Sequence, residues 1–154
     1  MAKKEINGLS QSIIESYSSQ LLEVSKNIDQ DIQKAAELII NNSGKVVISG
    51  LGKSGLIGQK IVATLCSTGT RSVYMHAAEA IHGDLGIYNP GDPTILISKS
   101  GNTEELVRLI PVLKEFQSPL ISIVGNVDSF IAKNADIVLN GTVEKAVSYT
   151  HLRA

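Results

Sequence analysis

Apolar side chains recur along the chain at two spacings, which separate helices from strands. Residues 9–42 contain neither proline nor glycine, and their apolar positions recur every three or four residues, as in an amphipathic helix. Asp29 or Asp31 is suited to cap a second helix, and Gly44 in the sequence NNSG is a typical stop signal. The pattern therefore predicts two helices before the first strand.

Beyond Gly44, short apolar runs alternate with helical stretches. The runs that predict buried strands are residues 45–50, 71–76, 94–98, 119–125 and 136–140. The stretches that predict helices or a short helix with a loop are residues 53–69, 77–92, 102–116 and 128–135. The helix predicted over residues 53–69 has one apolar face, formed by Leu56, Ile57, Ile61, Val62 and Leu65. The third has Leu106, Leu109, Ile110 and Leu113 on one face, with Pro111 expected to kink it.

Uninterrupted apolar strands separated by helices are typical of an α/β fold with a parallel sheet covered on both faces. For five strands we expect the flavodoxin-like order 2-1-3-4-5, in which ligands bind at the carboxyl ends of strands 1 and 3. The sequences GLGKSG (residues 50–55, the glycine loop) and SKSGNT (residues 98–103, the serine loop) follow those two strands. The topology therefore predicts that both loops line one crevice.

The serine loop has the composition of a phosphate site. Ser98, Ser100 and Thr103 supply hydroxyl donors, and Gly101 lets the backbone approach a ligand closely. The N–H groups at the start of the following helix favour an anion. The alternative is that Asn102 or Thr103 is an ordinary helix cap, with acidic residues complementing the helix dipole. That alternative does not account for three hydroxyls around a glycine.

The glycine loop admits three interpretations. It satisfies the dinucleotide fingerprint G-x-G-x-x-G, but strand 2 ends at Met75-His76 without the acidic residue that the fingerprint requires. It is not a P-loop, because Val47 stands where the first glycine belongs. Lys53 is best interpreted as a charge that faces an anionic substrate, and the alternative is a solvated lysine at a helix start.

The sequence HAAEAIHGD places His76, Glu79, His82 and Asp84 within nine residues after strand 2. On a helix, Glu79 and His82 would share a face, and a carboxylate beside an imidazole suits general acid–base chemistry. A metal site and a polar surface loop are the alternatives. We expect no metal here, because the sequence offers no second dense set of ligands.

Charge and cysteine content narrow the function classes. The net charge of −1 and the absence of a basic stripe argue against a nucleic-acid partner. Cys66 is the only cysteine, so no internal disulfide forms, and its apolar neighbours predict a buried core thiol. The first residues lack the apolar segment of a signal peptide, and no apolar run is long enough for a membrane span. We therefore expect a cytoplasmic protein without a membrane partner.

Taken together, GLGKSGLIGQKIVATLCSTGT, EAIHGDLG, SKSGNTEEL with LIPVLK, and DIVLN resemble the sugar isomerase (SIS) domain, and within it the arabinose 5-phosphate isomerases. The resemblance covers residues 44–143. It implies interconversion of ribulose 5-phosphate and arabinose 5-phosphate through an enediol(ate), without a cofactor, feeding 3-deoxy-octulosonate and lipopolysaccharide synthesis. A sugar-phosphate-binding SIS module without catalysis is the alternative.

The resemblance also implies site residues and a homo-oligomer, either a dimer or a tetramer, with residues 9–42 as a contact surface. Matched by position, the catalytic polar set comprises Lys53, Glu79, His82 and Glu105. The substrate- and phosphate-binding set comprises Gly52, Ser54, Ser98, Ser100, Gly101 and Thr103.

The domain division expected from these patterns is residues 1–43 for the N-terminal helices, 44–145 for the SIS domain and 146–154 for a tail. From Ala146 the sequence departs from the family pattern, which continues with a glutamate, a Ser/Thr run and a distal histidine. His151 is not expected to replace that histidine.

Overall fold

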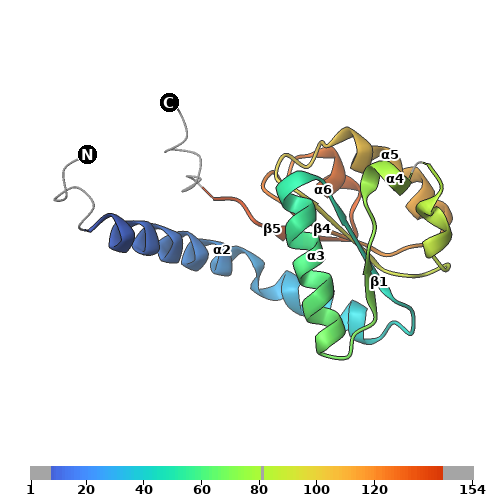
Figure 1. Ribbon diagram of the computed structural model, residues 1–154, viewed down its shortest axis with the longest axis horizontal. Helices are drawn as coiled ribbons and strands as arrows, with labels where there is room; N and C mark the ends of the chain where they lie inside the picture. Colours follow the sequence, from blue (N-terminus) through green and yellow to red (C-terminus); the bar gives the residue numbers. More distant parts are fainter. Residues whose placement is uncertain (1–7, 81, 144–154) are drawn as a thin grey trace.

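The computed structural model describes residues 8–80 and 82–143, and within them the chain forms a parallel sheet with helices on both faces (Figure 1). The strand order is β2-β1-β3-β4-β5, which confirms the predicted order. The strands are β1 (Val46–Gly50), β2 (Ser72–Tyr74), β3 (Thr94–Ser98), β4 (Leu120–Val124) and β5 (Ile137–Asn140). The expected tail and its His151 lie outside the described residues.

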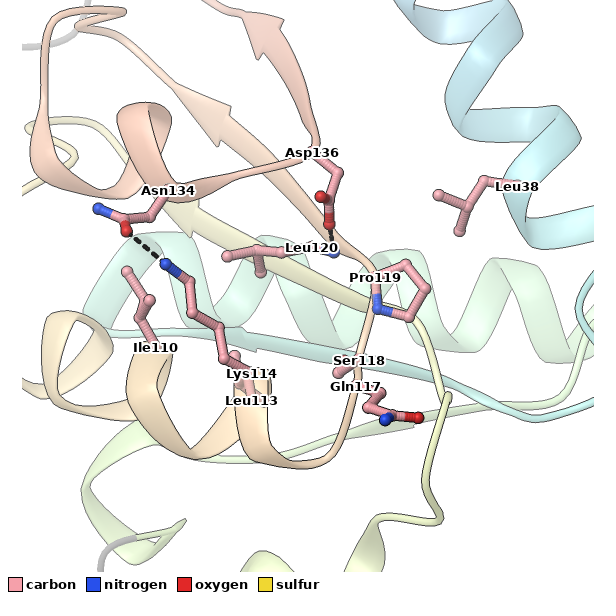
Figure 2. A pocket seen from close by; sticks show the side chains of 10 residues that line it. All are labelled: Leu38, Ile110, Leu113, Lys114, Gln117, Ser118, Pro119, Leu120, Asn134 and Asp136. Carbon is pink, nitrogen blue, oxygen red and sulfur yellow. Dashed lines mark hydrogen bonds between the residues drawn. The ribbon is translucent and has the colours of Figure 1, made fainter.

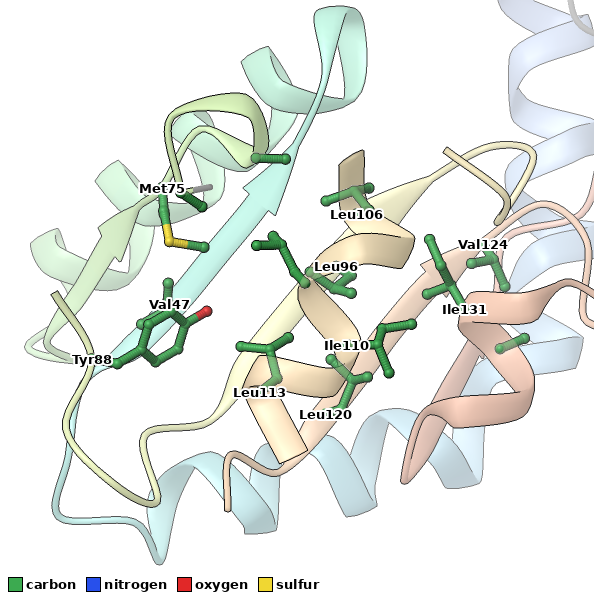
Figure 3. Close-up of a cluster of buried hydrophobic side chains, with 14 residues drawn as sticks. Val47, Met75, Tyr88, Leu96, Leu106, Ile110, Leu113, Leu120, Val124 and Ile131 are labelled. Carbon is green, nitrogen blue, oxygen red and sulfur yellow. The ribbon is translucent and has the colours of Figure 1, made fainter. Parts of the chain in front are cut away.

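The two faces of the sheet carry separate cores. One face packs against α2 (Leu9–Ile40) and α3 (Gly52–Ser67), and its buried side chains are Ala35, Val46, Ile48, Ile95, Ile97 and Ile121. The other face packs against α4 (Ala77–Ala80), α5 (Glu104–Glu115) and α6 (Phe130–Asn134), where Leu96 lies beneath α5 (Figure 3). A 3₁₀ turn, η1 (Asp84–Ile87), connects α4 toward β3. Both faces of β1, β3 and β4 are buried, which explains their uninterrupted apolar sequences.

Helix α5 follows its sequence pattern closely. The four predicted core residues Leu106, Leu109, Ile110 and Leu113 are all buried. Pro111 lies on the exposed side, and the helix continues through it to Glu115. The start of α5 at Glu104 fixes where the serine loop must end.

Residues 9–40 form one continuous helix of 32 residues, so the prediction of two helices is wrong. Asp31 does not interrupt the helix, and its carboxylate pairs instead with Lys34 at 2.8 Å. Without glycine or proline, an aspartate costs only a fraction of a kcal/mol in a helix interior, about 0.7 or less, which is too little to break it. The helix extends away from the sheet, and Ile14, Leu21 and Leu22 on it are exposed (Figure 1).

Helix α3 packs through Ile61, Val62 and Leu65 of its predicted face, which are partly buried against the core, and in its first turns through glycine. Its buried residues are Gly55 and Gly58, whereas Leu56 and Ile57 are 65% and 55% exposed, contrary to the predicted face. A Cβ on Gly58 would lie 3.2 Å from the Tyr74 ring, so the missing side chain makes room for that ring. The close approach rotates part of the apolar pattern toward the surface.

Cys66 is exposed, so the prediction of a buried core thiol is wrong. Its sulfur lies 3.3 Å from the hydroxyl and 3.4 Å from the carbonyl oxygen of Ser72. Hydrogen bonds with the Ser72 side chain and with its backbone lower the pKa of the thiol. Cys66 lies at the end of α3, beyond the turns that contain the buried Gly55 and Gly58.

Asp92 organises the amino-terminal edge of the sheet. Its carboxylate is 1% exposed, pairs with the Lys45 ammonium and accepts the Lys45 N–H at 3.0 Å and the Asn89 N–H at 2.7 Å. Burial alone would raise the pKa of this carboxyl, but the hydrogen bonds from Lys45 and Asn89 lower it below its ordinary value. Asp92 thereby ties the entry to β1 to the entry to β3.

In the described ranges, 8–80 and 82–143, no helix combines the length and the apolar content that crossing a bilayer requires.

Candidate functional site

The carboxyl ends of β1 and β3 open into a hollow of about 430 Å³. Residues from both loops line it, namely Leu51, Ser54, Ile97, Ser98, Lys99, Ser100 and Thr103. The two strands are hydrogen-bonded neighbours, with Gly50 paired to Ile97 at their ends. The prediction that both loops meet in one crevice is therefore confirmed.

Hydroxyl groups hold the serine loop in a tight curve. Ser98 is 3% exposed, and its Oγ lies 2.8 Å from Thr103 Oγ1 and accepts the Gly101 N–H at 3.0 Å. The exposed Ser100 accepts the Asn102 N–H at 3.3 Å. Ser98 therefore shapes the loop from within, while Ser100 lies at its surface and borders the hollow.

Neither helix that starts at the hollow has a side-chain cap. Thr103 and Leu51 are the N-cap residues of α5 and α3, and neither side chain accepts a hydrogen bond from its helix. The Thr103 hydroxyl contacts Ser98, and the Asn102 side chain contacts the Phe130 N–H, so the ordinary-cap interpretation is wrong for both residues. Helix starts without a side-chain acceptor are well suited to bind an anion.

Gly101 adopts a conformation that only glycine takes readily. Its φ is 65°, in the left-handed region, and a Cβ would overlap the Ser129 hydroxyl. The glycine loop also contains a left-handed residue, Gly52, with φ 53°. Both glycines that the sequence placed in the binding set are thus required by the shape of the two turns.

Tyr74 supports the glycine loop from the neighbouring strand. Its hydroxyl donates to the Gly50 carbonyl at 2.6 Å, and a Cβ on Gly55 would lie 2.5 Å from the same hydroxyl. Burial raises the pKa of the Tyr74 phenol. No signal in the sequence pointed to this contact, because it depends on how β2 lies beside β1.

Lysine supplies the positive charge near the hollow. Lys99 lines it, and the exposed Lys53 lies in the first turn of α3, next to the lining residue Ser54. Lys53 was predicted to face an anionic substrate, whereas Lys99, which lies inside the serine loop motif, was not predicted as a site residue. Its position between Ser98 and Ser100 in the sequence could have identified it.

The predicted acid–base residues lie away from the lining of this hollow as the structure describes it. Glu79 is exposed on α4, and α4 ends at Ala80, so the prediction that Glu79 and His82 share a helical face is wrong. His82 instead closes a turn, in which its N–H donates to the Glu79 carbonyl at 2.9 Å. Glu105 is half-buried in the first turn of α5, and α4 packs against that helix.

His76, like His82, is exposed, and its ring meets the Tyr74 ring edge-on with centroids 6.5 Å apart. In the part of the chain that the structure describes, no group of three or more His, Cys, Asp or Glu side chains is arranged to hold a metal ion. The groups that the hollow offers to an anion are helix starts, hydroxyls and a lysine.

A second hollow, of about 400 Å³, lies at the amino edge of the sheet (Figure 2). Lys114 donates to the Asn134 side chain at 2.8 Å, and Asp136 accepts the Leu120 N–H at 2.7 Å. The remaining lining includes apolar side chains from α2, α5 and β4, among them Leu38 and Ile110. The carboxyl-edge hollow is the better candidate for an anionic ligand, because two helix starts without side-chain caps border it.

Known proteins resemble the chain over most of its length. The chain is 51% identical over 123 residues to the arabinose 5-phosphate isomerase KpsF of Escherichia coli O6:H1, covering 79% of this chain and 38% of that protein. It is 46% identical over 135 residues to a probable arabinose 5-phosphate isomerase of Haemophilus influenzae, covering 88% and 40%. The chain thus spans about 40% of the length of these relatives.

A solved structure from Escherichia coli CFT073, described as a complex with arabinose 5-phosphate, superposes with a TM-score of 0.85. It is 34% identical and covers 99% of this chain and 81% of that one. The SIS domain family model matches residues 39–152, which include both loops and the whole sheet. The chain therefore belongs to the SIS domain family.

Proposed function

We propose that the chain is the SIS domain of an aldose–ketose isomerase that interconverts ribulose 5-phosphate and arabinose 5-phosphate. The observation that carries the proposal is the pair of uncapped helix starts at one hollow, bordered by the hydroxyls of Ser54, Ser100 and Thr103. This arrangement suits a phosphate group, since helix-start N–H groups, hydroxyl groups and Lys99 border the hollow. The names of the relatives supply the sugar.

The reaction moves one proton between adjacent carbons. A base removes a proton from C1 of the ketose, the C2 carbonyl oxygen gains a proton, and an enediol(ate) results. Return of a proton to C2, with loss of the C1 hydroxyl proton, gives the aldose, so neither a redox group nor a metal is required. We assign the proton transfer to Glu105 or His82, with Glu79 in the same polar set, and the oxyanion contact to Lys53.

The binding set in this proposal comprises Gly52, Ser54, Ser98, Ser100, Gly101 and Thr103. Ser98 acts mainly by shaping the loop, given its burial and its bonds to Gly101 and Thr103. The product would enter 3-deoxy-octulosonate and lipopolysaccharide synthesis in the cytoplasm.

A sugar-phosphate-binding module without catalysis is the second candidate. The observation that favours it is the position of Glu79 and His82, which lie outside the lining of the hollow. Binding without turnover would identify this function, whereas turnover would exclude it.

Calorimetric titration with arabinose 5-phosphate tests binding in the wild type, in Ser100→Ala and in Ser67→Ala. Ser67 is a matched control, because its hydroxyl bonds only locally to Thr64 near the far end of α3. A hydrogen bond to a charged group contributes about 1.5–3 kcal/mol, so Ser100→Ala should weaken binding by about tenfold to a hundredfold. The Ser67→Ala variant should bind like the wild type.

Turnover is tested by incubating the protein with arabinose 5-phosphate in heavy water and following by NMR the replacement of the proton at C2 of the sugar by deuterium. The wild type should exchange this proton, and Glu105→Gln should lose most of the rate while keeping affinity. Folded wild-type protein that binds no sugar phosphate would contradict the proposal. Equal binding by Ser100→Ala would place the phosphate elsewhere.

A further inference from the structure

The serine loop contacts a part of the chain that belongs to the next β–α unit. The Gly125 N–H donates to the Lys99 carbonyl at 3.1 Å, and the Ile131 N–H donates to the Gly101 carbonyl at 3.0 Å. Gly101 also lies against the side chain of Ser129, which is 2% exposed. The segment from Gly125 to Ile131, called here the wall of the loop, therefore packs against it.

The Asn102 side chain reaches across to this wall through a hydrogen bond. Its Oδ1 accepts the Phe130 N–H at 2.9 Å, and its Nδ2 donates to the Ser100 carbonyl at 3.3 Å. Phe130 is the first residue of α6, so its N–H has no acceptor within the helix. The amide thus bonds at one end to the backbone of Ser100 and at the other to the start of α6.

We infer that Asn102 is a positioning residue, which fixes the Ser100 turn of the serine loop by fastening it to the start of α6. The inference rests on the proposed function in one respect, namely that Ser100 contacts the phosphate of the substrate. Binding groups must be held within about 0.5 Å of their productive geometry, and an exposed loop does not reach that precision through its own bonds. A hydrogen bond to α6 supplies this precision, because the helix is held in place by Ile131 and Ala132, which are buried in the core.

Loss of the Asn102 side chain should weaken binding of the phosphate and leave the proton transfer largely unchanged. A group far from the reacting carbons contributes mainly uniform binding, so its loss raises KM more than it lowers kcat. Asn102→Ala removes two hydrogen bonds at an exposed site, which should raise KM or the dissociation constant about threefold to tenfold. The value of kcat should change by about twofold or less.

Two further variants separate positioning from general destabilisation. Asn134→Ala removes a similar amide at the other end of α6, where Asn134 bonds to Lys114 and to the Phe130 carbonyl. It should leave sugar-phosphate affinity unchanged. Asn102→Asp keeps an oxygen that can accept the Phe130 N–H but loses the donor to the Ser100 carbonyl, so it should restore the loop's order in part.

Amide hydrogen exchange in the ligand-free full chain provides a measurement that does not depend on the substrate. The Gly101 and Gly125 N–H groups should exchange about threefold to tenfold faster in Asn102→Ala than in the wild type. In Asn134→Ala they should exchange at rates near that of the wild type, and in Asn102→Asp at rates between those of the wild type and Asn102→Ala. Thermal melting of all four proteins shows that each is folded.

The outcomes distinguish this inference from the proposed function. If the wild type binds no sugar phosphate but Asn102→Ala loosens the two amides as described, the proposed substrate is wrong and the fastening stands. If Asn102→Ala exchanges like the wild type, or Asn102→Asp exchanges as fast as Asn102→Ala, the inference is wrong. Equal affinity of Asn102→Ala and the wild type for arabinose 5-phosphate would also overturn it.

Discussion

At the scale of single residues, Gly101 decides the shape of the serine loop. Its left-handed backbone turns the chain back toward Ser98, whose Oγ accepts the Gly101 N–H. Its lack of a side chain lets Ser129 lie against it, so that Ile131 can donate to its carbonyl. One glycine thus satisfies a turn and a packing contact simultaneously.

Gly101→Ala should therefore destabilise the protein and abolish the anion site. A strained backbone position costs about 1–3 kcal/mol, and the new methyl group must also displace Ser129. Thermal denaturation measures the stability loss, and titration with arabinose 5-phosphate measures binding. Gly86→Ala is the control, because a Cβ there would meet nothing within 4 Å. A Gly101→Ala protein with wild-type stability and affinity would contradict this account of the loop.

At the scale of elements, the sheet depends on a buried ion pair at its amino edge. Asp92 accepts N–H groups from two connections and pairs with Lys45, so it fixes where β1 and β3 begin. Removing one partner of a buried pair costs about 3–5 kcal/mol, because the other charge remains without compensation.

The lowered pKa of Asp92 gives the stability a defined pH dependence. A carboxyl whose folded-state pKa lies below the unfolded value of about 3.9 stabilises the fold above that pH. The contribution is lost as the pH falls from about 5 through the folded-state pKa. Urea denaturation between pH 7 and pH 3 should show this loss in the wild type and a flatter profile in Asp92→Asn.

The matched control for this measurement is Asp31→Asn, which removes the surface pair with Lys34 on α2. Surface pairs contribute about 1 kcal/mol or less, so this variant should follow the wild-type profile. If Asp92→Asn and the wild type lose stability in parallel on acidification, Asp92 is not the source of the pH dependence.

At the scale of the whole molecule, α2 is an element whose large apolar side chains remain exposed. Leu21 and Leu22 are 68% and 66% exposed, Ile14 is 64% exposed, and the helix extends away from the sheet (Figure 1). Exposed apolar surface of this kind marks contact with other proteins. We propose that it joins copies of this chain into a dimer or a tetramer.

Sedimentation velocity at micromolar concentration tests the assembly. The wild type should sediment as a homo-oligomer, and the double variant Leu21→Gln with Leu22→Gln should shift toward the monomer. Both substitutions lie at exposed positions of a long helix and conserve its propensity, so the fold should remain intact. A monomeric wild type would contradict the proposed contact surface.

The sequence by itself determined the strands, their order and the meeting of the two loops at one edge of the sheet. Uninterrupted apolar strands between helices require a parallel sheet buried on both faces, and the strand order then brings the two loops together. Leu106, Leu109, Ile110 and Leu113 were placed correctly, because a helical period of 3.6 residues decides which side chains face a core. These properties follow from local spacing.

Tertiary structure decided what local spacing does not contain. Gly55 and Gly58 rather than Leu56 and Ile57 face the sheet, because the Tyr74 ring occupies the space beside α3. Cys66 is exposed, His82 lies outside α4, and the Asn102 side chain contacts α6 rather than its own helix. Gly58 packs against Tyr74 and Asn102 bonds to Phe130, and because both neighbours lie on other elements, these contacts are absent from the local spacing.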